Sequence, residues 1–435
     1  MSSELAYYLM GCGSCIYLLY DFSFELRKLI KAFIASQIIG DMIFAPWLSE
    51  LPVYRFMTKL ETSDRFYALL VVLACVALMD AGFALIRPPR RSVPLVSTLY
   101  LRRTGGTFVL IALLCKLTSL AAAGVLFHPL EALSLQPEAL VGASFLDVIG
   151  STLLPMGLAF WVLSSDKRRH GIALCCVVLF GMFSPWKGDI VRMAACYIFA
   201  LGLWGWQFVR EAIIGRHALL FCVGVMLFLP IKTQLRSDAA VSLDPPAFAT
   251  YLVMGTSGRA TGGIFQTFAE AARSIRDHSS HLMGGRYNLQ AAYLWVPRML
   301  WPDKPRVAAE QVYDYLDLSE ESYGTSFAVT VFGTFYLDFG LWGCLLCSFA
   351  LGLMLSLAER WPARYERTDP IKSYAVAALI LSVAFNLGEA GIPPVVSQLL
   401  ACTVVLFAGL KIAKWASVPT ASSHYGGVEI AKEAL

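Results

Sequence analysis

The fold is decided by twenty consecutive residues, 67–86, which read YALLVVLACVALMDAGFALI. Only Asp80 among them is charged. A helix of about 20 apolar residues is about 30 Å long, which matches the hydrocarbon core of a bilayer. This stretch therefore predicts a membrane-spanning helix, and comparable stretches recur along the chain.

Composition agrees with a membrane protein. Of 435 residues, 57% are hydrophobic and 15% are charged, against about 45–50% and about 25% in soluble domains. The net charge is only +4, and no region interleaves basic with aromatic residues as nucleic-acid surfaces do. We therefore expect no nucleic-acid partner. No basic leader with a small-residue cleavage site precedes the first apolar segment, which is expected to remain as a span.

Eleven apolar segments are predicted as spans, so we expect an all-α polytopic membrane protein. One of them, 327–358, is predicted to hold a helix with an extra segment leading into it. The eleven segments are 4–20, 32–48, 67–86, 107–127, 140–163, 171–185, 190–208, 217–231, 327–358, 373–390 and 395–410.

Lysine and arginine fall mainly on one side of these spans. The connections on that side carry twenty of them, and the short connections on the other side carry four. Because cytoplasmic loops hold the excess of basic residues, we expect a multi-pass protein of a bacterial inner membrane, with its N-terminus in the periplasm and its C-terminus in the cytoplasm. The chain then divides into an N-terminal transmembrane bundle of about eight spans (1–231), a large, partly helical periplasmic loop (232–325), C-terminal transmembrane helices (326–414) and a cytoplasmic tail (415–435).

Four ionisable residues lie within the predicted spans, and these are Asp41, Asp80, Lys116 and Asp147. A charge in the bilayer is expensive and is usually functional or paired. Either these residues form a proton or ion path, or they pair inside the protein. We favour internal pairing for at least two of them.

Two CxxC spacings occur, Cys12–Cys15 and Cys344–Cys347. Such pairs bind zinc or act in redox chemistry when partner ligands lie nearby. Here both lie in apolar helical surroundings without such partners, so we expect the cysteines to pack between helices as small residues.

The long loop contains an amphipathic segment, 263–276, which reads GIFQTFAEAARSIR. A helical period puts its apolar residues on one face, with Arg273 and Arg276 largely elsewhere. Such a helix either lies flat at the membrane surface or packs on a core made by the loop itself.

The loop is basic in its first part and acidic in its last. Residues 232–306 carry nine Lys or Arg against five Asp or Glu, while 308–323 carries five acids and no base. This reversal predicts that the basic part meets an anion such as a diphosphate, because arginine binds phosphate oxygens in pairs. The alternative is that these are ordinary surface charges. A short turn on the same side, 185–192, adds further charges.

Two segments resemble motifs of a known family. Residues 297–305, PRMLWPDKP, are similar to a motif of bacterial Wzy-type polymerases, which join the oligosaccharide repeat units of O-antigen, capsule and exopolysaccharide. The pattern GxxYxxFGxxG at 333–343 resembles a second element of these proteins. The architecture, with many spans and a large periplasmic loop before the last few helices, is similar as well.

The resemblance implies glycosyl transfer between lipid carriers by an enzyme similar to the GT-C membrane glycosyltransferases. The growing glycan would move from undecaprenyl diphosphate onto the non-reducing end of a new lipid-linked repeat unit at the periplasmic face. It implies no nucleotide sugar, no metal and no other cofactor. The implied partners are the lipid-linked donor and acceptor, membrane lipids, a chain-length regulator and a flippase.

Site residues are predicted within this framework. Cations near the departing diphosphate would lower the barrier as its charge develops, and the attacking hydroxyl needs a base within hydrogen-bond reach. The predicted base is Asp303 or His278, and Asp189 is the third candidate. Asp303 has a structural alternative, a salt bridge to Arg306 or a cap for its turn, and the alternative for His278 is an exposed polar residue. The predicted diphosphate ligands are Lys187, Arg192, Arg273, Arg276, Arg286, Arg298, Lys304 and Arg306.

Two other functions stay open. An O-antigen ligase uses the same donor but transfers the glycan to a lipid A core. A flippase or other transporter of lipid-linked oligosaccharides is expected to have charge-lined spans, short loops and two comparable halves, which this sequence does not display. The WPDKP segment favours the polymerase.

Overall fold

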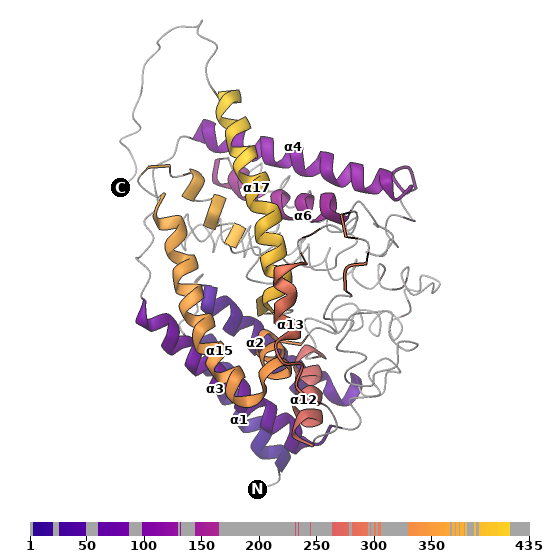
Figure 1. Ribbon diagram of the computed structural model, residues 1–435, viewed down its shortest axis with the longest axis vertical. Helices are drawn as coiled ribbons and strands as arrows, with labels where there is room; N and C mark the ends of the chain where they lie inside the picture. The colour runs from indigo at the N-terminus through magenta and orange to yellow at the C-terminus, as the bar shows by residue number, and fades with distance from the viewer. Residues whose placement is uncertain are drawn as a thin grey trace, which may run out of the picture.

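Helices are the only regular secondary structure in the parts of the chain that the computed structural model describes (Figure 1). The predicted spans 171–185, 190–208 and 217–231 lie outside the described residues. The structure describes residues 3–20, 26–48, 60–86, 98–128, 144–164, 263–277, 281–294, 329–365 and 391–417, parts of 296–305 and 368–388, and a few single residues between them.

Helices stand at seven of the eleven predicted spans, and the predicted span 373–390 is described only as separate helical turns. No strand occurs among the described residues, which confirms the all-α fold class for them. The helices are α1 (Ser3–Leu19), α2 (Leu26–Leu48), α3 (Thr62–Leu85), α4 (Thr98–Ala122), α6 (Ser144–Ser164), α12 (Gly263–Arg276), α13 (Arg286–Leu289), the 3₁₀ helix η3 (Gln290–Ala292), α15 (Val331–Ala363) and α17 (Ile392–Ser417).

Four of the described helices are long and apolar enough to cross a membrane. They are α3, α15, most of α4 and most of α17, and shorter apolar stretches occur in α1 and α6. Their exposed side chains are largely apolar, as lipid-facing surfaces require; Trp342 and Leu346 of α15, for example, are 80% and 70% exposed. Several apolar helices of membrane-crossing length are therefore present.

Helices α3 and α15 pack side by side and run in the same direction (Figure 1). The contacts keep a constant register, with the hydroxyls of Tyr67 and Tyr336 at 2.9 Å and the sulfurs of Cys75 and Cys344 at 3.3 Å. Further along, a Cβ on Gly352 would collide with the carbonyl oxygen of Met79. Small residues thus let the two backbones touch, as they do where helices associate in bilayers.

Helix α15 consists of two arms that meet at Gly340, where φ is 67° and ψ is −165°. Only glycine adopts this backbone conformation at little cost. An unbroken helix of its 33 residues would be about 50 Å long, well beyond the bilayer core of about 30 Å. The break leaves a longer arm, 341–363, and a short arm, 331–339, before it, which confirms the predicted extra segment.

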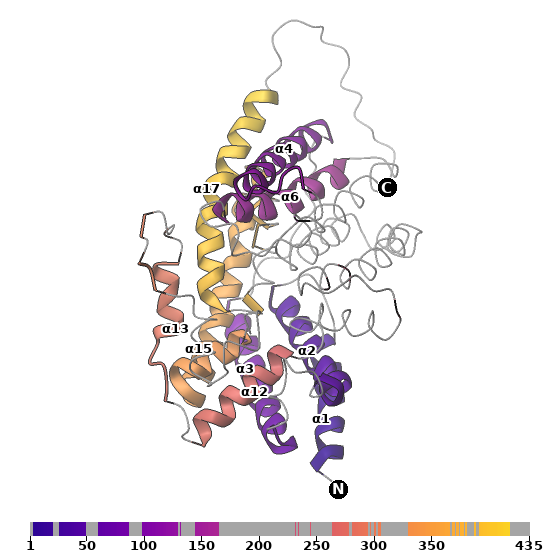
Figure 2. The same cartoon turned by 90° about the vertical axis from the view of Figure 1, so that its right-hand side faces the viewer.

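Helices α4 and α6 form an antiparallel pair that crosses α17 (Figures 1 and 2). Their backbones approach at Gly105 and Gly157, where a Cβ on either would lie within 3 Å of the other's carbonyl oxygen. Deeper in the pair, the ammonium of Lys116 lies 2.6 Å from a carboxylate oxygen of Asp147 and 2.5 Å from the hydroxyl of Ser151. All three side chains are buried.

Asp80 is also paired, near the C-terminal end of α3. Its carboxylate lies 2.8 Å from the ammonium of Lys31 and 3.3 Å from the guanidinium of Arg27, both on α2. The prediction that at least two of the intramembrane ionisable residues pair internally is therefore confirmed. At this same end, a carboxylate oxygen of Glu359 in α15 accepts from the backbone N–H of Leu26 at 2.5 Å, so one acid satisfies a free donor at the start of α2.

Candidate functional site

The segment predicted as an amphipathic helix is helical from Gly263 to Arg276, which confirms that prediction. Its apolar face, with Phe265 and Phe268 fully buried, packs against α2, α3 and α15 (Figure 2). Because this face is buried against protein, it does not lie open as it would on a membrane surface, which was one of the two expected positions. The apolar helices themselves provide the surface that buries it.

Glycine at position 333 lets α12 approach the short arm of α15. A Cβ there would lie 2.9 Å from the Val329 Cβ and 3.1 Å from the Phe268 ring. The Phe268 ring in turn makes an edge contact with the Tyr336 ring, with the centroids 5.8 Å apart. Gly333 and Tyr336 of the 333–343 motif thus form part of the surface on which α12 packs.

A buried polar cluster lies under α12. A carboxylate oxygen of Asp41 in α2 accepts from the hydroxyl of Tyr7 in α1, and its other oxygen accepts from the amide of Gln266 in α12 at 2.5 Å. Asp41 is 1% exposed. Three helices, α1, α2 and α12, therefore meet around one acid, which is hydrogen-bonded inside the protein.

The two arginines of α12 are held by carboxylates. The Arg273 guanidinium donates to Glu270 at 3.1 and 2.5 Å. The Arg276 guanidinium lies 2.6 Å from Asp64 of α3 and 3.3 Å from Asp277. The hydrogen bonds with Glu270 and with Asp64 raise the pKa of Arg273 and of Arg276 respectively. The structure thus brings two predicted diphosphate ligands together, but it gives each an anionic partner from the protein.

The break in α15 holds the segment 281–294 through backbone hydrogen bonds. An interrupted helix leaves carbonyl groups without their usual partners. Two of these, on Leu337 and Asp338, accept from the backbone N–H groups of Met283 and Gly284 at 2.9 and 3.0 Å. Backbone N–H groups of the loop therefore replace the helical donors that these carbonyl groups lack at the Gly340 break.

The Asp338 carboxylate adds a second set of bonds to the same segment. It accepts from the backbone N–H groups of Tyr287 and Asn288, at 2.9 and 2.8 Å, and from the Asn288 amide at 2.7 Å. Gly284 and Gly285, with φ of 61° and 89°, give the turn that aims these donors at Asp338. An acid at the first turn of a helix also suits the helix dipole. The break and α13 therefore form one rigid junction.

Arg286, the first residue of α13, is exposed at this junction. Its backbone N–H donates to the Met283 carbonyl at 3.3 Å, but among the described residues its guanidinium makes no hydrogen bond or ion pair. Among the described residues, the Arg286 guanidinium therefore lacks a carboxylate partner such as those of Arg273 and Arg276.

Lys304 and Asp303 lie in the turn that follows. The Lys304 ammonium donates to the carbonyl oxygens of Leu294 and Val296 at 3.1 and 2.9 Å, so it ties this turn to the end of the α13 segment. Asp303 is exposed. The predicted site residues Lys187, Asp189, Arg192, His278, Arg298 and Arg306 lie outside the described residues.

The sequence analysis missed several acids that join the helices of this fold. Asp338 and Glu359 lie in or beside an apolar segment, the same signal that drew attention to Asp41. Asp64 and Glu270 could not be found in this way, because neither lies in an apolar stretch and their role depends on contacts across the fold. In the part of the chain that the structure describes, no three His, Cys, Asp or Glu side chains gather as a metal site would require.

No protein-family model, curated protein or solved structure matches this chain. The class that the described residues define is therefore an all-helical protein with several apolar helices of membrane-crossing length. In this protein the loop helices α12 and α13 contact the broken helix α15. Buried acids lie under α12 and at the break in α15.

Proposed function

We propose that this chain is a membrane glycosyltransferase that polymerises lipid-linked oligosaccharide repeat units. It would transfer the growing glycan from undecaprenyl diphosphate to the non-reducing end of a new lipid-linked repeat at the periplasmic face of the inner membrane. The proposal rests first on the likeness of residues 297–305 and 333–343 to motifs of Wzy-type polymerases.

One structural observation supports this proposal. Gly333, Tyr336, Phe339 and Gly340 of the 333–343 motif lie at the junction of α12, α13 and the break in α15. Gly333 gives α12 room to pack, and Gly340 forms the break. Phe339 lies against Gly285, and a Cβ on Gly285 would be 3.4 Å from the Phe339 ring. A binding or catalytic site needs a rigid support that holds its side chains in fixed positions. These glycines and aromatic residues provide such a support.

The chemistry proposed for this junction uses Arg286. Negative charge develops on the diphosphate as the glycosidic bond breaks, and a fixed cation beside it stabilises the transition state. Arg286 stands on a helix that Asp338 anchors, and its guanidinium is exposed. Lys304, Arg298 and the remaining predicted cations would complete the diphosphate site, with Asp303, His278 or Asp189 as the base.

The finer architecture is part of the same proposal. It comprises about eleven spans in a GT-C-like arrangement, with the N-terminus in the periplasm and the C-terminus in the cytoplasm. The placement of charges supports this orientation. Arg27 and Lys31, predicted to be cytoplasmic, contact the C-terminal end of α3, while Arg276 of the predicted periplasmic loop contacts its N-terminal end.

The experiment compares Arg286→Ala with the control Arg102→Ala, an exposed arginine on α4. Each variant complements a strain that lacks the gene, with protein amounts checked by immunoblot. We expect Arg286→Ala to lower polymerisation by about 10²–10³-fold, the usual cost of losing one such donor, so that single repeat units accumulate on the carrier. Arg102→Ala should keep the wild-type chain lengths.

The other outcomes distinguish the rival functions. Wild-type chain lengths in a stably expressed Arg286→Ala strain would remove this residue from the site. If the deletion strain still makes long glycans but leaves them on the lipid carrier, the chain is a ligase. If repeat units stay on the cytoplasmic side, it is a flippase.

A further inference from the structure

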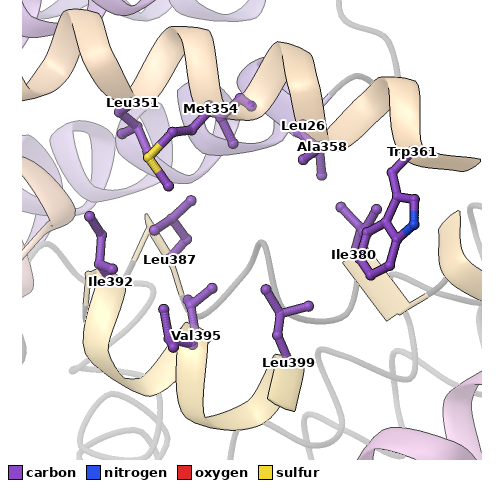
Figure 3. A pocket seen from close by; sticks show the side chains of 12 residues that line it. Leu26, Leu351, Met354, Ala358, Trp361, Ile380, Leu387, Ile392, Val395 and Leu399 are labelled. Carbon is purple, nitrogen blue, oxygen red and sulfur yellow. The ribbon is translucent and has the colours of Figure 1, made fainter. Parts of the chain in front are cut away.

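An apolar cavity lies between α15, α17 and the helical turns of 371–388 (Figure 3). Its volume is about 140 Å³, and it is partly open, so an occupant can extend beyond it. Twelve residues line it, and the indole N–H of Trp361 is the only nitrogen or oxygen on their side chains. Trp361 marks one end of the cavity, and Ile392 and Leu351 lie toward the other (Figure 3).

The lining determines what kind of molecule can fill this space. A water molecule needs two to four polar partners, which this wall does not offer. An empty apolar space would forfeit the dispersion contacts of every side chain around it. Helices α15 and α17 are both of membrane-crossing length, and in a bilayer the material around them would be hydrocarbon. A lipid chain is therefore the occupant that fits.

The Trp361 end of the cavity carries polar and basic groups. The hydroxyl of Ser373 donates to the carbonyl of Pro362 at 2.9 Å, which brings the turn 371–373 beside this end of α15. Arg364 follows within one turn of Trp361 and is exposed. A tryptophan next to basic side chains is typical of the level at which lipid headgroups lie.

Lys372 is held at the same place by two aromatic rings. Its ammonium lies 4.0 Å from the centre of the Tyr365 ring and 4.8 Å from that of Phe407. Such contacts fix a cation without neutralising it. Among the described residues, no carboxylate lies within ion-pair distance of either Lys372 or Arg364. Asp369 accepts from the backbone N–H of Lys372 at 3.1 Å, so these described residues of the rim carry two positive charges and one negative charge.

We propose that this cavity binds one acyl chain of an anionic phospholipid, with its phosphate at Arg364 and Lys372. The apolar wall selects the chain, and the two cations select the negative headgroup. This lipid is distinct from the donor and acceptor of the proposed reaction, whose diphosphates would be bound at the opposite end of α15. The inference does not depend on the proposed function.

The test uses the purified full chain in detergent with phosphatidylglycerol that carries a diazirine on one acyl chain. After irradiation, peptide mass spectrometry locates the labelled residues. We expect labelling within 351–361 and 392–399. Ala358→Trp places an indole in the cavity and should abolish this labelling. Leu357→Trp, on the neighbouring exposed position, should preserve it.

A second comparison tests the headgroup site. Unlabelled phosphatidylglycerol should displace the probe better than phosphatidylcholine does. Replacing either Arg364 or Lys372 with Gln should lower that preference by about fivefold, the usual effect of one basic residue near a charged lipid.

Three results would overturn the proposal. Equal labelling in Ala358→Trp and Leu357→Trp would show that the chain binds elsewhere. Equal displacement by the two phospholipids would show that the site has no anionic selectivity. Displacement by undecaprenyl phosphate at lower concentration than phosphatidylglycerol would show that the cavity belongs to the isoprenoid carrier.

Discussion

The carboxylate of Asp338 accepts a hydrogen bond of 2.9 Å from the backbone N–H of Tyr287, and this contact joins the loop helix α13 to the break in α15. Asp338 is 1% exposed, so its charge is stabilised almost entirely by the donors that it holds. One buried acid therefore couples the position of Arg286 to the backbone of an apolar helix.

Replacing this acid should loosen the junction. Asp338→Ala removes the acceptor of three donors, and unsatisfied buried donors cost about 1–3 kcal/mol each before water relieves them. We expect a loss of stability of about 2–4 kcal/mol and faster proteolysis within 281–294. Thermal unfolding in detergent measures the first and limited proteolysis the second. Asp303→Ala, at an exposed acid of the same loop, should change neither, and an unchanged Asp338→Ala protein would contradict this role.

The break at Gly340 makes a separate prediction. Gly340→Ala places a Cβ on a residue with φ of 67°, which costs about 1–3 kcal/mol where the surroundings hold the conformation. The matched control is Gly13→Ala in α1, where a Cβ would meet nothing within 4 Å. Alanine there should be neutral or slightly stabilising, because it favours helix. Equal melting temperatures for the two variants would mean that α15 does not need its break.

Two native cysteines report on the packing of α3 against α15. The sulfurs of Cys75 and Cys344 are 3.3 Å apart and buried. Treatment of the purified chain with iodine should oxidise the two thiols to a disulfide, which peptide mass spectrometry would identify as a linked pair. Gly352→Val should suppress the link, since its side chain would collide with the Met79 carbonyl. If Cys75 links instead to a different cysteine, the register of these helices is wrong.

Much of the local structure could be predicted from the sequence. The amphipathic period of 263–276 and the excess length of 327–358 are properties of short stretches, and both predictions were confirmed. The prediction that at least two intramembrane ionisable residues pair internally followed from the cost of burying a single charge, and Lys116 with Asp147 is one such pair. These predictions needed only a helical period and the free energy of a charge in an apolar medium.

The contacts that build the candidate site could not be predicted in the same way. Gln266 and Asp41 are 225 positions apart, and Arg276 and Asp64 are 212 apart. No spacing rule links them, because their meeting depends on where α12 docks. Arg273 and Arg276 therefore suggested free phosphate ligands, whereas the fold gives each a carboxylate partner.

The two ends of α15 should face opposite sides of the membrane. Leu289→Cys lies on an exposed position of α13, and Arg364→Cys lies on an exposed position after the other end of α15. In intact spheroplasts, a maleimide that cannot cross membranes should label Cys at 289 and leave Cys at 364 unlabelled until lysis, with peptide mapping to separate native cysteines. The reverse pattern would overturn the proposed orientation.

The most direct measurement of the proposed activity is reconstitution of the purified chain in liposomes with undecaprenyl-diphosphate-linked repeat units from its own host. We predict a ladder of longer glycans together with release of undecaprenyl diphosphate, without added nucleotide sugar, and loss of the ladder with Arg286→Ala. Repeat units that stay single in the presence of the folded wild-type chain would contradict a polymerase.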